Sequence, residues 1–353
     1  MNHDDASRRL SRRHAIRLLG FGSGLGLAAG TRAIAAPPLR AAAGQKPGIP
    51  KGAIIRTVLK DVPPDRLGTG AALMHEHVTA GNDVDVLVDE VRASGQEGVS
   101  CLVDAAVGKR RPGALDNLRT IASRSGVHIV AAGGYYKAPY PPDVAQKSED
   151  AIADELVQDA AADRWGALGE IGTSLDMQPD ERKMLRAVSK AHARTGLPIF
   201  THTEHQGCSS CALAQLDVFE AAGVNPQNLC IGHMSDILDD PQSETHKKVA
   251  RRGVFVGLDT VGHQMLQGPK ATDALKVKTV LALLDAGLED FVLLASDFAH
   301  QQCLKSTWGA GYSTVVSVFV PKLRYAGVKE GTIRKILVDN PRRFLAFVPK
   351  KLS

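Results

Sequence analysis

The chain has 353 residues, a formal net charge of +5 and five cysteines. The positive charge is concentrated at the start, because residues 1–35 hold six arginines and two aspartates, which contribute +4 and leave +1 for all later residues. A near-neutral body without a basic cluster argues against nucleic-acid binding, and no later segment has the uninterrupted apolar length of a membrane helix.

The amino-terminal segment has the features of a twin-arginine-type signal peptide. The pair Arg12–Arg13 follows a serine, a glycine-rich apolar run covers 18–30, and an A-x-A cleavage pattern stands at 33–35. This order is typical of a secretory signal, and the paired arginines indicate the twin-arginine export machinery as a partner. We expect residues 1–35 to be removed and 36–353 to be exported, to the periplasm or outside the cell. A disordered basic tail is the alternative, and the cleavage pattern argues against it.

The remaining chain alternates short apolar segments with amphipathic helical patterns. Helices are predicted at 83–98 and at 180–196, the second ending at a glycine that suits a helix stop. The segments predicted as strands are 71–78, 100–107, 127–136, 165–174, 197–204, 228–235, 253–260 and 290–298. This alternation predicts an α/β fold, a single-domain (β/α)8 TIM barrel over 36–353. An open doubly wound sheet is the alternative, but no glycine-rich phosphate loop follows the first strand.

Two histidines lie one residue apart in the first predicted strand, in the sequence LMHEHV. Residues i and i+2 of a strand face the same way, so the imidazoles of His75 and His77 share one space. In a barrel the functional groups gather where strands end. The later strands end with further imidazoles and carboxylates: Glu170, His202, His233 and Asp297. In number and type these side chains match the ligands of a two-metal hydrolase site.

Seven elements of the sequence resemble the phosphotriesterase-related family of the amidohydrolase superfamily. They are HEH (75–77), GEIGTS (169–174), THT (201–203), CIGH (230–233), GLDT (257–260), SDF (296–298) and NPRRFL (340–345). They occur in order from the first strand to the carboxyl terminus, so the resemblance covers essentially the whole mature chain. A short motif such as HxH is weak alone, whereas seven motifs in register are specific.

The resemblance implies two divalent metal ions, with Zn²⁺ as the expected ion. The implied ligands are His75, His77 and Asp297 for the more buried ion, and His202 and His233 for the more exposed one. Glu170 stands at the position of the residue that bridges both ions. In many family members this residue is a lysine carbamylated by carbon dioxide, so the glutamate places this chain outside the best-known organophosphate-degrading branch.

A charge count shows why a glutamate can serve as the bridge. Two divalent ions bring four positive charges, while Glu170, Asp297 and a bridging hydroxide remove three. The residual positive charge favours negative charge that develops on a carbonyl or phosphoryl oxygen. The ions lower the pKa of the bridging water towards neutrality and so supply a nucleophile. Asp297 is the predicted catalytic residue, which orients the hydroxide and takes its proton.

Two further residues are candidates for substrate contact. Tyr136 ends the third strand, where lactonase-like relatives carry a site tyrosine; a packing aromatic with a solvated hydroxyl is the alternative. Asp259 ends the seventh strand and is a candidate for relaying a proton or positioning substrate. Glu76 is expected to face away from the barrel mouth, as a structural partner beneath a helix. Four residues of the mouth loops are expected at the surface: His205, His263, His300 and Lys305.

The cysteines are expected to have no catalytic role. The sequence CSSC at 208–211 has the spacing of a redox or metal pair, but no second pair or nearby histidine completes a zinc site. In an exported chain, a disulfide between Cys208 and Cys211, or from one of them to Cys303, is consistent with this pattern. Cys101 and Cys230 begin strands and are expected in the core.

The predicted function is that of a binuclear metal-dependent hydrolase, which cleaves an ester or lactone of a small molecule by attack of a metal-bridging hydroxide. Phosphotriester (aryldialkylphosphate) hydrolysis is the alternative. A metal-binding barrel without turnover is less favoured, because all six ligand types are intact. The sequence is also compatible with a homodimer. Specificity depends on the loops after the seventh and eighth strands, and periodicity does not decode these loops.

Overall fold

The computed structural model describes residues 48–78, 83–105, 108, 110–204, 208–263 and 272–350. The predicted signal peptide at 1–35 and the loop residue His205 lie outside the described residues. Within the described ranges, no helix combines the length and the apolar character that crossing a membrane requires.

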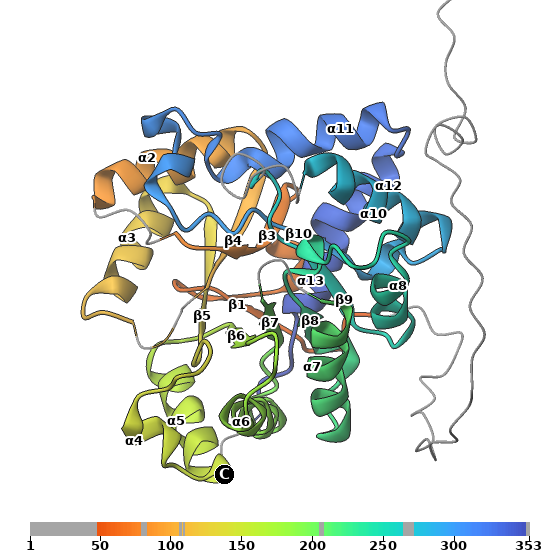
Figure 1. The fold of residues 1–353 in the computed structure, drawn as a ribbon. Helices are drawn as coiled ribbons and strands as arrows, with labels where there is room; N and C mark the ends of the chain where they lie inside the picture. Colours follow the sequence, from red (N-terminus) through yellow and green to blue (C-terminus); the bar gives the residue numbers. More distant parts are fainter. Residues whose placement is uncertain are drawn as a thin grey trace, which may run out of the picture. The chain divides into compact units, whose positions relative to one another are not determined.

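Eight parallel strands form the centre of the fold (Figure 1). They are β3 (Ala71–Glu76), β4 (Val99–Asp104), β5 (His128–Gly133), β6 (Ala167–Thr173), β7 (Ile199–Thr203), β8 (Leu229–Ile231), β9 (Phe255–Leu258) and β10 (Val292–Leu294). Each strand pairs with the next along the chain, from β3 to β10. Beyond the end of β10, the backbone N–H of Asp297 donates to the carbonyl of His75 on β3 at 3.0 Å. The sheet is thus a nearly closed barrel, which confirms the predicted TIM barrel.

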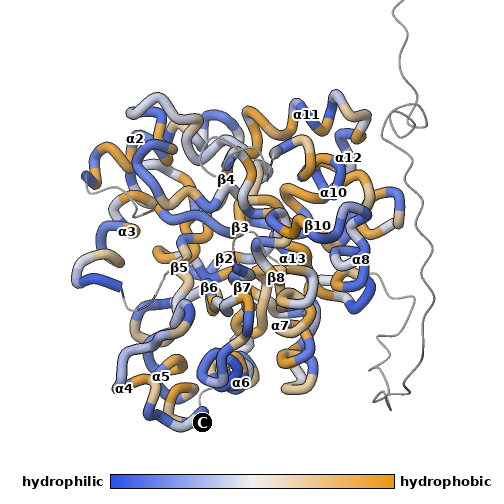
Figure 2. Tube along the Cα trace, viewed as in Figure 1, coloured by the Kyte–Doolittle hydropathy of each residue, from blue (hydrophilic) through white to orange (hydrophobic). Residues whose placement is uncertain are grey.

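Helices surround the strands and cover the outside of the barrel (Figure 1). They are α2 (Val84–Gln96), α3 (Ala114–Ser125), α4 (Pro142–Ala145), α5 (Glu149–Ala162), α6 (Pro179–Thr195), α7 (Ser209–Ala221), α8 (Glu244–Arg251), α10 (Asp273–Asp285), α11 (Val320–Tyr325), α12 (Glu330–Arg334) and α13 (Asn340–Leu345). The helices predicted at 83–98 and 180–196 are confirmed as α2 and α6. In Figure 2 the helices carry both hydrophobic and hydrophilic residues along their length, as one-sided packing requires.

Local sequence signals explain the bounds of α6. Pro179 occupies its first turn, where the missing N–H costs nothing, and Gln178 and Glu181 form a capping box. The helix ends at Gly196, which takes a left-handed conformation with φ +79°. Its buried residues include Met184 and Val188, four apart and therefore on one face.

Short elements connect the larger strands and helices. Strands β1 (Ile55–Arg56) and β2 (Asp61–Val62) pair in antiparallel fashion. The 3-10 segments are η1 (Pro64–Arg66), η2 (Pro226–Asn228), η3 (Met234–Asp236), η4 (Glu289–Phe291), η5 (Gln301–Cys303), η6 (Lys305–Thr307) and η7 (Gly311–Ser313), and the π-helical segments are η8 (Val315–Phe319) and η9 (Lys335–Asp339).

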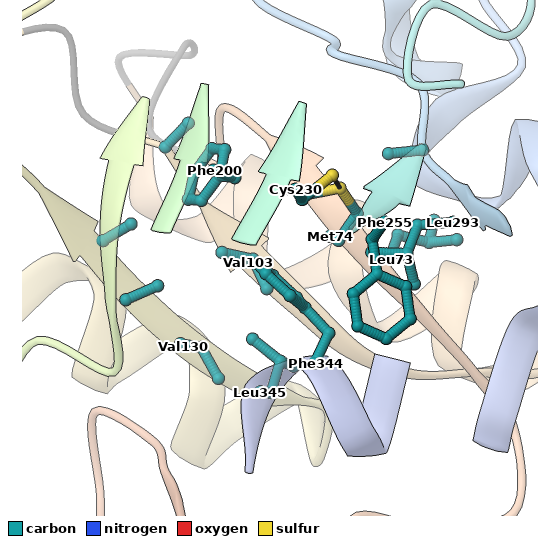
Figure 3. Packing of buried hydrophobic residues seen from close by; sticks show 14 of the residues in the cluster. Leu73, Met74, Val103, Val130, Phe200, Cys230, Phe255, Leu293, Phe344 and Leu345 are labelled. Carbon is teal, nitrogen blue, oxygen red and sulfur yellow. Dashed lines mark hydrogen bonds between the residues drawn. The ribbon is translucent and has the colours of Figure 1, made fainter. Parts of the chain in front are cut away.

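The apolar core fills the lower part of the barrel (Figure 3). Phe344 and Leu345 of α13 are fully buried below the strands, and the ring of Phe344 lies 5.6 Å from that of Phe255 on β9. Higher up, Met74 Sδ and Cys230 Sγ approach to 3.7 Å. Truncating Phe344 to alanine would cost roughly 3–5 kcal/mol, as for other buried aromatics. Apolar residues fill the amino-terminal half, and the buried polar side chains of the strands lie towards their carboxyl ends.

All eight predicted strands are present, but several end earlier than their apolar segments. The segment 228–235 forms a strand only to Ile231, after which His233 takes a left-handed conformation with φ +52°. Position 232 requires glycine, because the Cβ of any other residue would lie only 1.9 Å from the carbonyl oxygen of Thr201. The early ending releases His233 from the ladder and lets its side chain reach the site.

Candidate metal centre

The six predicted ligands lie together at the carboxyl ends of the barrel strands. His75 lies on β3 and His77 directly follows it, while Glu170 and His202 lie on β6 and β7. His233 and Asp297 follow β8 and β10. All are buried except His77, which is partly exposed. The structure therefore brings all six side chains to one site, as the barrel topology predicts.

One group consists of the paired histidines and the aspartate after the last strand. His77 Nε2 lies 3.0 Å from Asp297 Oδ1, and His75 Nε2 lies 3.4 Å from the same oxygen. One potential ligand atom from each residue lies within 4.8 Å of the other two. Both imidazoles thus face a single carboxylate, which agrees with the shared face expected from their spacing.

Glu170 lies between this group and the remaining histidines. Its Oε2 atom lies 3.2 Å from His75 Nε2, 2.9 Å from His202 Nδ1 and 3.6 Å from His233 Nε2. Its Oε1 atom lies 3.7 Å from His77 Nε2. A single carboxylate therefore faces all four imidazoles, which is the placement that a bridging ligand needs.

Charge interactions shift the pKa values at this site strongly. Burial lowers the pKa of His75, but the carboxylates of Glu170 and Asp297 outweigh burial and raise it well above the usual range. Burial likewise lowers the pKa of His233, and the nearby carboxylates raise it to about 9. In Glu170 and Asp297, burial raises the pKa, whereas the facing imidazoles hold it below the usual range. The cluster therefore favours ionised carboxylates, which is the form that binds cations.

The chemistry of these side chains fits a pair of divalent ions. Among the described residues, His75 Nε2 is buried without a hydrogen-bond partner, although it faces two carboxylates. The other ring nitrogen of His75 is bonded to Asp259, so Nε2 is the atom left for a ligand. Imidazoles with carboxylates are the ligands that Zn²⁺ and similar ions take in hydrolases, and binding an ion releases the protons that the carboxylates otherwise hold on these imidazoles.

Asp259 lies behind the ligands rather than at the mouth. Its carboxylate is fully buried, lies 3.0 Å from His75 Nδ1 and accepts the backbone N–H of His233 at 2.8 Å. The sequence suggested substrate contact or proton relay for this residue. The observed position instead favours orientation of the predicted ligand His75, because a carboxylate on one ring nitrogen fixes the other.

Tyr136, a predicted substrate contact, lies beside the site. Its hydroxyl lies 2.8 Å from His202 Nε2, and the residue is partly exposed. Burial, together with the charges of Glu170 and Glu204, raises the pKa of Tyr136, so that the hydroxyl stays neutral and can donate a hydrogen bond. Lys137 lies over the tyrosine ring at 5.6 Å and pairs with Glu204 at 2.5 Å.

Two polar residues at the site have partners that the sequence did not indicate. Glu76 is a structural partner, as expected: it is fully buried and accepts the backbone N–H groups of Ser296 and Phe298, the neighbours of Asp297. His263 is buried rather than at the surface and donates from Nε2 to the Asp297 carbonyl at 3.1 Å. Both contacts join distant segments, and no local motif signals them. His300 is exposed as expected, and Lys305 is half-buried and paired with Glu97.

The cysteines follow one of the two pairings left open by the sequence. Cys208 and Cys211 form a disulfide at the start of α7. Cys303 is free and buried, and Cys101 and Cys230 are buried core residues as predicted. The sulfur atoms therefore take no part in the cluster of imidazoles and carboxylates.

Comparison with known proteins identifies the family. The model of the phosphotriesterase family matches residues 54–345. This chain belongs to the phosphotriesterase family. The resemblance noted in the sequence is thus confirmed. Phosphotriesterase-family members are hydrolases with binuclear metal centres, and the cluster described here could hold such a centre.

Individual relatives span most of the chain. The phosphotriesterase homology protein of Escherichia coli (strain K12) is 31% identical over 301 residues, which covers 78% of this chain and 98% of the relative. The N-acetyltaurine hydrolase of Tetraodon nigroviridis is 28% identical over 287 residues, covering 77% and 80%. The crystal structure of a lactonase from Listeria monocytogenes matches with a TM-score of 0.73 and 25% identity, covering 83% of this chain and 99% of that one.

Proposed function

We propose that this protein is a binuclear metal-dependent hydrolase that cleaves an ester or lactone bond in a small molecule. The observation that carries the proposal is the position of Glu170, whose carboxylate faces His75, His77, His202 and His233 within 3.7 Å. Such a residue can serve two ions at once. The similarity to a lactonase structure supports the ester or lactone class.

The side chains offer ligands for two ions. In the proposed centre, His75, His77 and Asp297 would hold one ion, His202 and His233 would hold the other, and Glu170 would contribute to both. When bound, the pair, expected to be Zn²⁺, would polarise the carbonyl oxygen of the substrate and lower the pKa of a water molecule towards neutrality.

Asp297 is the proposed catalytic residue. Its carboxylate lies between the imidazoles of His77 and His233, at 3.0 and 3.8 Å, at the centre of the cluster. From there it orients the attacking water and accepts its proton as the water oxygen bonds to the carbonyl carbon. The proton then passes to the leaving alcohol oxygen as the carbon–oxygen bond breaks, which balances the reaction.

Tyr136 is the proposed substrate contact at the rim. Its neutral hydroxyl lies next to His202 and can donate to a substrate oxygen. A partly exposed donor beside buried ligands is well placed to hold the substrate against the reacting groups.

Phosphotriester hydrolysis is the alternative, since the family model carries that name. The test is a panel of lactones, aryl esters, phosphotriesters and N-acyl amides, assayed with purified protein after removal and return of Zn²⁺. We expect turnover of lactones or aryl esters to exceed that of the other classes. Turnover confined to phosphotriesters would establish the alternative, and turnover confined to amides would overturn the ester assignment.

Metal analysis of the same preparations tests the binuclear centre. We expect two ions in each wild-type chain and about one after His202→Ala and His233→Ala are combined, because the three ligands of the other ion remain. A folded wild type that holds one ion or none contradicts the binuclear proposal.

A further inference from the structure

Glu76 separates the two paired histidines in sequence and contacts the last ligand of the site in space. Its side chain is fully buried. Oε1 accepts the backbone N–H of Ser296 at 2.7 Å, and Oε2 accepts that of Phe298 at 3.2 Å. The two donors belong to the residues before and after Asp297, so one side chain holds the backbone on both sides of this predicted ligand.

The backbone of Asp297 is also held through its own peptide groups. Its N–H donates to the carbonyl of His75 at 3.0 Å, and its carbonyl accepts from His263 Nε2 at 3.1 Å. Asp297 has φ +48°, a left-handed conformation that is unfavourable for a residue other than glycine and needs support from its surroundings. Strand β10 ends at Leu294, so the sheet ladder does not supply this support.

We propose that Glu76 is a positioning residue, which fixes the backbone of Asp297 so that its carboxylate meets the imidazoles of His75 and His77. The inference rests on the metal centre proposed above. It assigns all three residues of the HEH sequence to one ion. His75 and His77 supply ligand atoms, and Glu76 holds the third ligand of the same set.

Both carboxyl oxygens of residue 76 act as hydrogen-bond acceptors. Each of the two carboxyl oxygens accepts one backbone N–H. Burial raises the pKa of Glu76 to about 8, against the effect of its two hydrogen bonds, yet a protonated carboxyl still offers a lone pair on each oxygen. A glutamine has one acceptor oxygen only, and its NH₂ group would face the second N–H. Glu76→Gln therefore removes one of the two bonds whatever the protonation state.

Glu90 of α2 provides a matched control, because it holds the backbone of the same loop after β10. Its buried carboxylate accepts the N–H groups of Lys305 at 2.9 Å and Ser306 at 2.7 Å. These donors also follow β10, but neither is adjacent to a predicted ligand. Glu90→Gln thus removes the same kind of bond from the same loop without touching the backbone of Asp297.

The experiment compares the wild type with Glu76→Gln, Glu76→Asp and Glu90→Gln. Zn²⁺ affinity is measured by competition with a chromophoric chelator, and hydrogen exchange of the segment 292–300 is measured by mass spectrometry in the metal-free protein. We expect Glu76→Gln to weaken the tighter Zn²⁺ site by about 10- to 100-fold, the range for partners of metal ligands, and to speed exchange in this segment. Glu76→Asp, whose side chain is too short to reach both donors, should also bind Zn²⁺ more weakly, and Glu90→Gln should stay within about twofold of wild type in affinity.

The outcomes separate the positioning role from a general loss of stability. Wild-type affinity and exchange in Glu76→Gln, or an equal loss of affinity in Glu90→Gln, would overturn the proposal. If Glu76→Gln does not fold, Glu76→Asp decides, because its shorter side chain cannot span both donors and unchanged values would refute the role. A wild type that binds fewer than two ions instead contradicts the binuclear centre, while exchange in the metal-free chain still tests the hold on Asp297.

Discussion

The carboxylate of Asp259 links two of the predicted ligands, since it lies 3.0 Å from His75 Nδ1 and 2.8 Å from the backbone nitrogen of His233. A carboxylate at Nδ1 favours a proton on that nitrogen, which leaves the lone pair of Nε2 directed at the cluster. Asp259 therefore sets the tautomer of His75 and the position of His233 together. This arrangement is typical of the outer partners of metal ligands.

Asp259→Asn is expected to weaken metal binding by about 10- to 100-fold, because the amide loses the charge that holds His75 in the binding tautomer. The measurement is Zn²⁺ affinity by chelator competition. Glu181→Gln is the control, since Glu181 is a buried carboxylate that caps α6 through Ser174 and Gln178. If Asp259→Asn keeps wild-type affinity but loses kcat/KM, the substrate or proton role expected from the sequence is the better assignment.

Tyr136→Phe is expected to lower kcat/KM by about 10- to 100-fold, as when one hydrogen-bond donor to the reacting group is removed. The metal content should not change, because His202 keeps its contact with Glu170 at 2.9 Å. Steady-state kinetics and metal analysis on one preparation check both points. Tyr135→Phe is the matched control, because that hydroxyl bonds to Glu155 instead of the site. Loss of an ion in Tyr136→Phe would show that the tyrosine acts through His202.

The sequence was sufficient to predict that the candidate ligands gather at one end of the barrel, but not which residues contact them. His75, Glu170 and Asp297 could be placed because parallel strands of a barrel end at one face, and periodicity locates strand ends to within a few residues. The partners of these ligands are set by contacts between distant segments. Asp259 meets His75 across 184 residues and Glu76 meets Ser296 across 220. No local pattern encodes such contacts, since they depend on how β3 closes against β10.

Dependence on distant contacts also explains why two predictions from the sequence were wrong. The strand predicted at 228–235 was too long because its apolar residues continue into a 3-10 segment, Met234–Asp236. His263 was expected at the surface because it stands in a loop, but it stacks on Phe298 at 5.8 Å and is buried. Whether a loop residue is buried depends on the loop that packs against it, and the periodicity of one segment carries no information about that neighbour.

Export through the twin-arginine route is proposed from the amino-terminal segment. Replacing Arg12–Arg13 with two lysines should leave the precursor inside the cell, because the route recognises the arginine pair. Fractionation followed by immunoblotting measures the processed and unprocessed forms. Replacing Arg8–Arg9 in the same way is the control and should not change export. Normal processing of the Arg12–Arg13 variant would indicate either that Arg8–Arg9 substitutes for this pair or that the signal uses the general secretory path.

The bridging role of Glu170 leads to a prediction about carbon dioxide. A carbamylated lysine needs carbon dioxide during metal loading, whereas the charge of a glutamate is part of its side chain. Activity recovered by returning Zn²⁺ to the metal-free protein should therefore be independent of added bicarbonate. Recovery assays with and without bicarbonate, in carbon-dioxide-depleted buffer, measure this directly.

Substitution of Glu170 tests the same role through charge. Glu170→Gln keeps the size of the side chain but removes the charge that faces four imidazoles, so the second ion should be lost and the rate should fall at least about 100-fold. Glu170→Lys should regain part of the activity only when bicarbonate is present, because carbamylation would restore a negative bridge. Metal analysis and initial rates measure both variants. A wild type that needs bicarbonate, or a fully active Glu170→Gln protein with two ions, would show that another residue joins the metal pair.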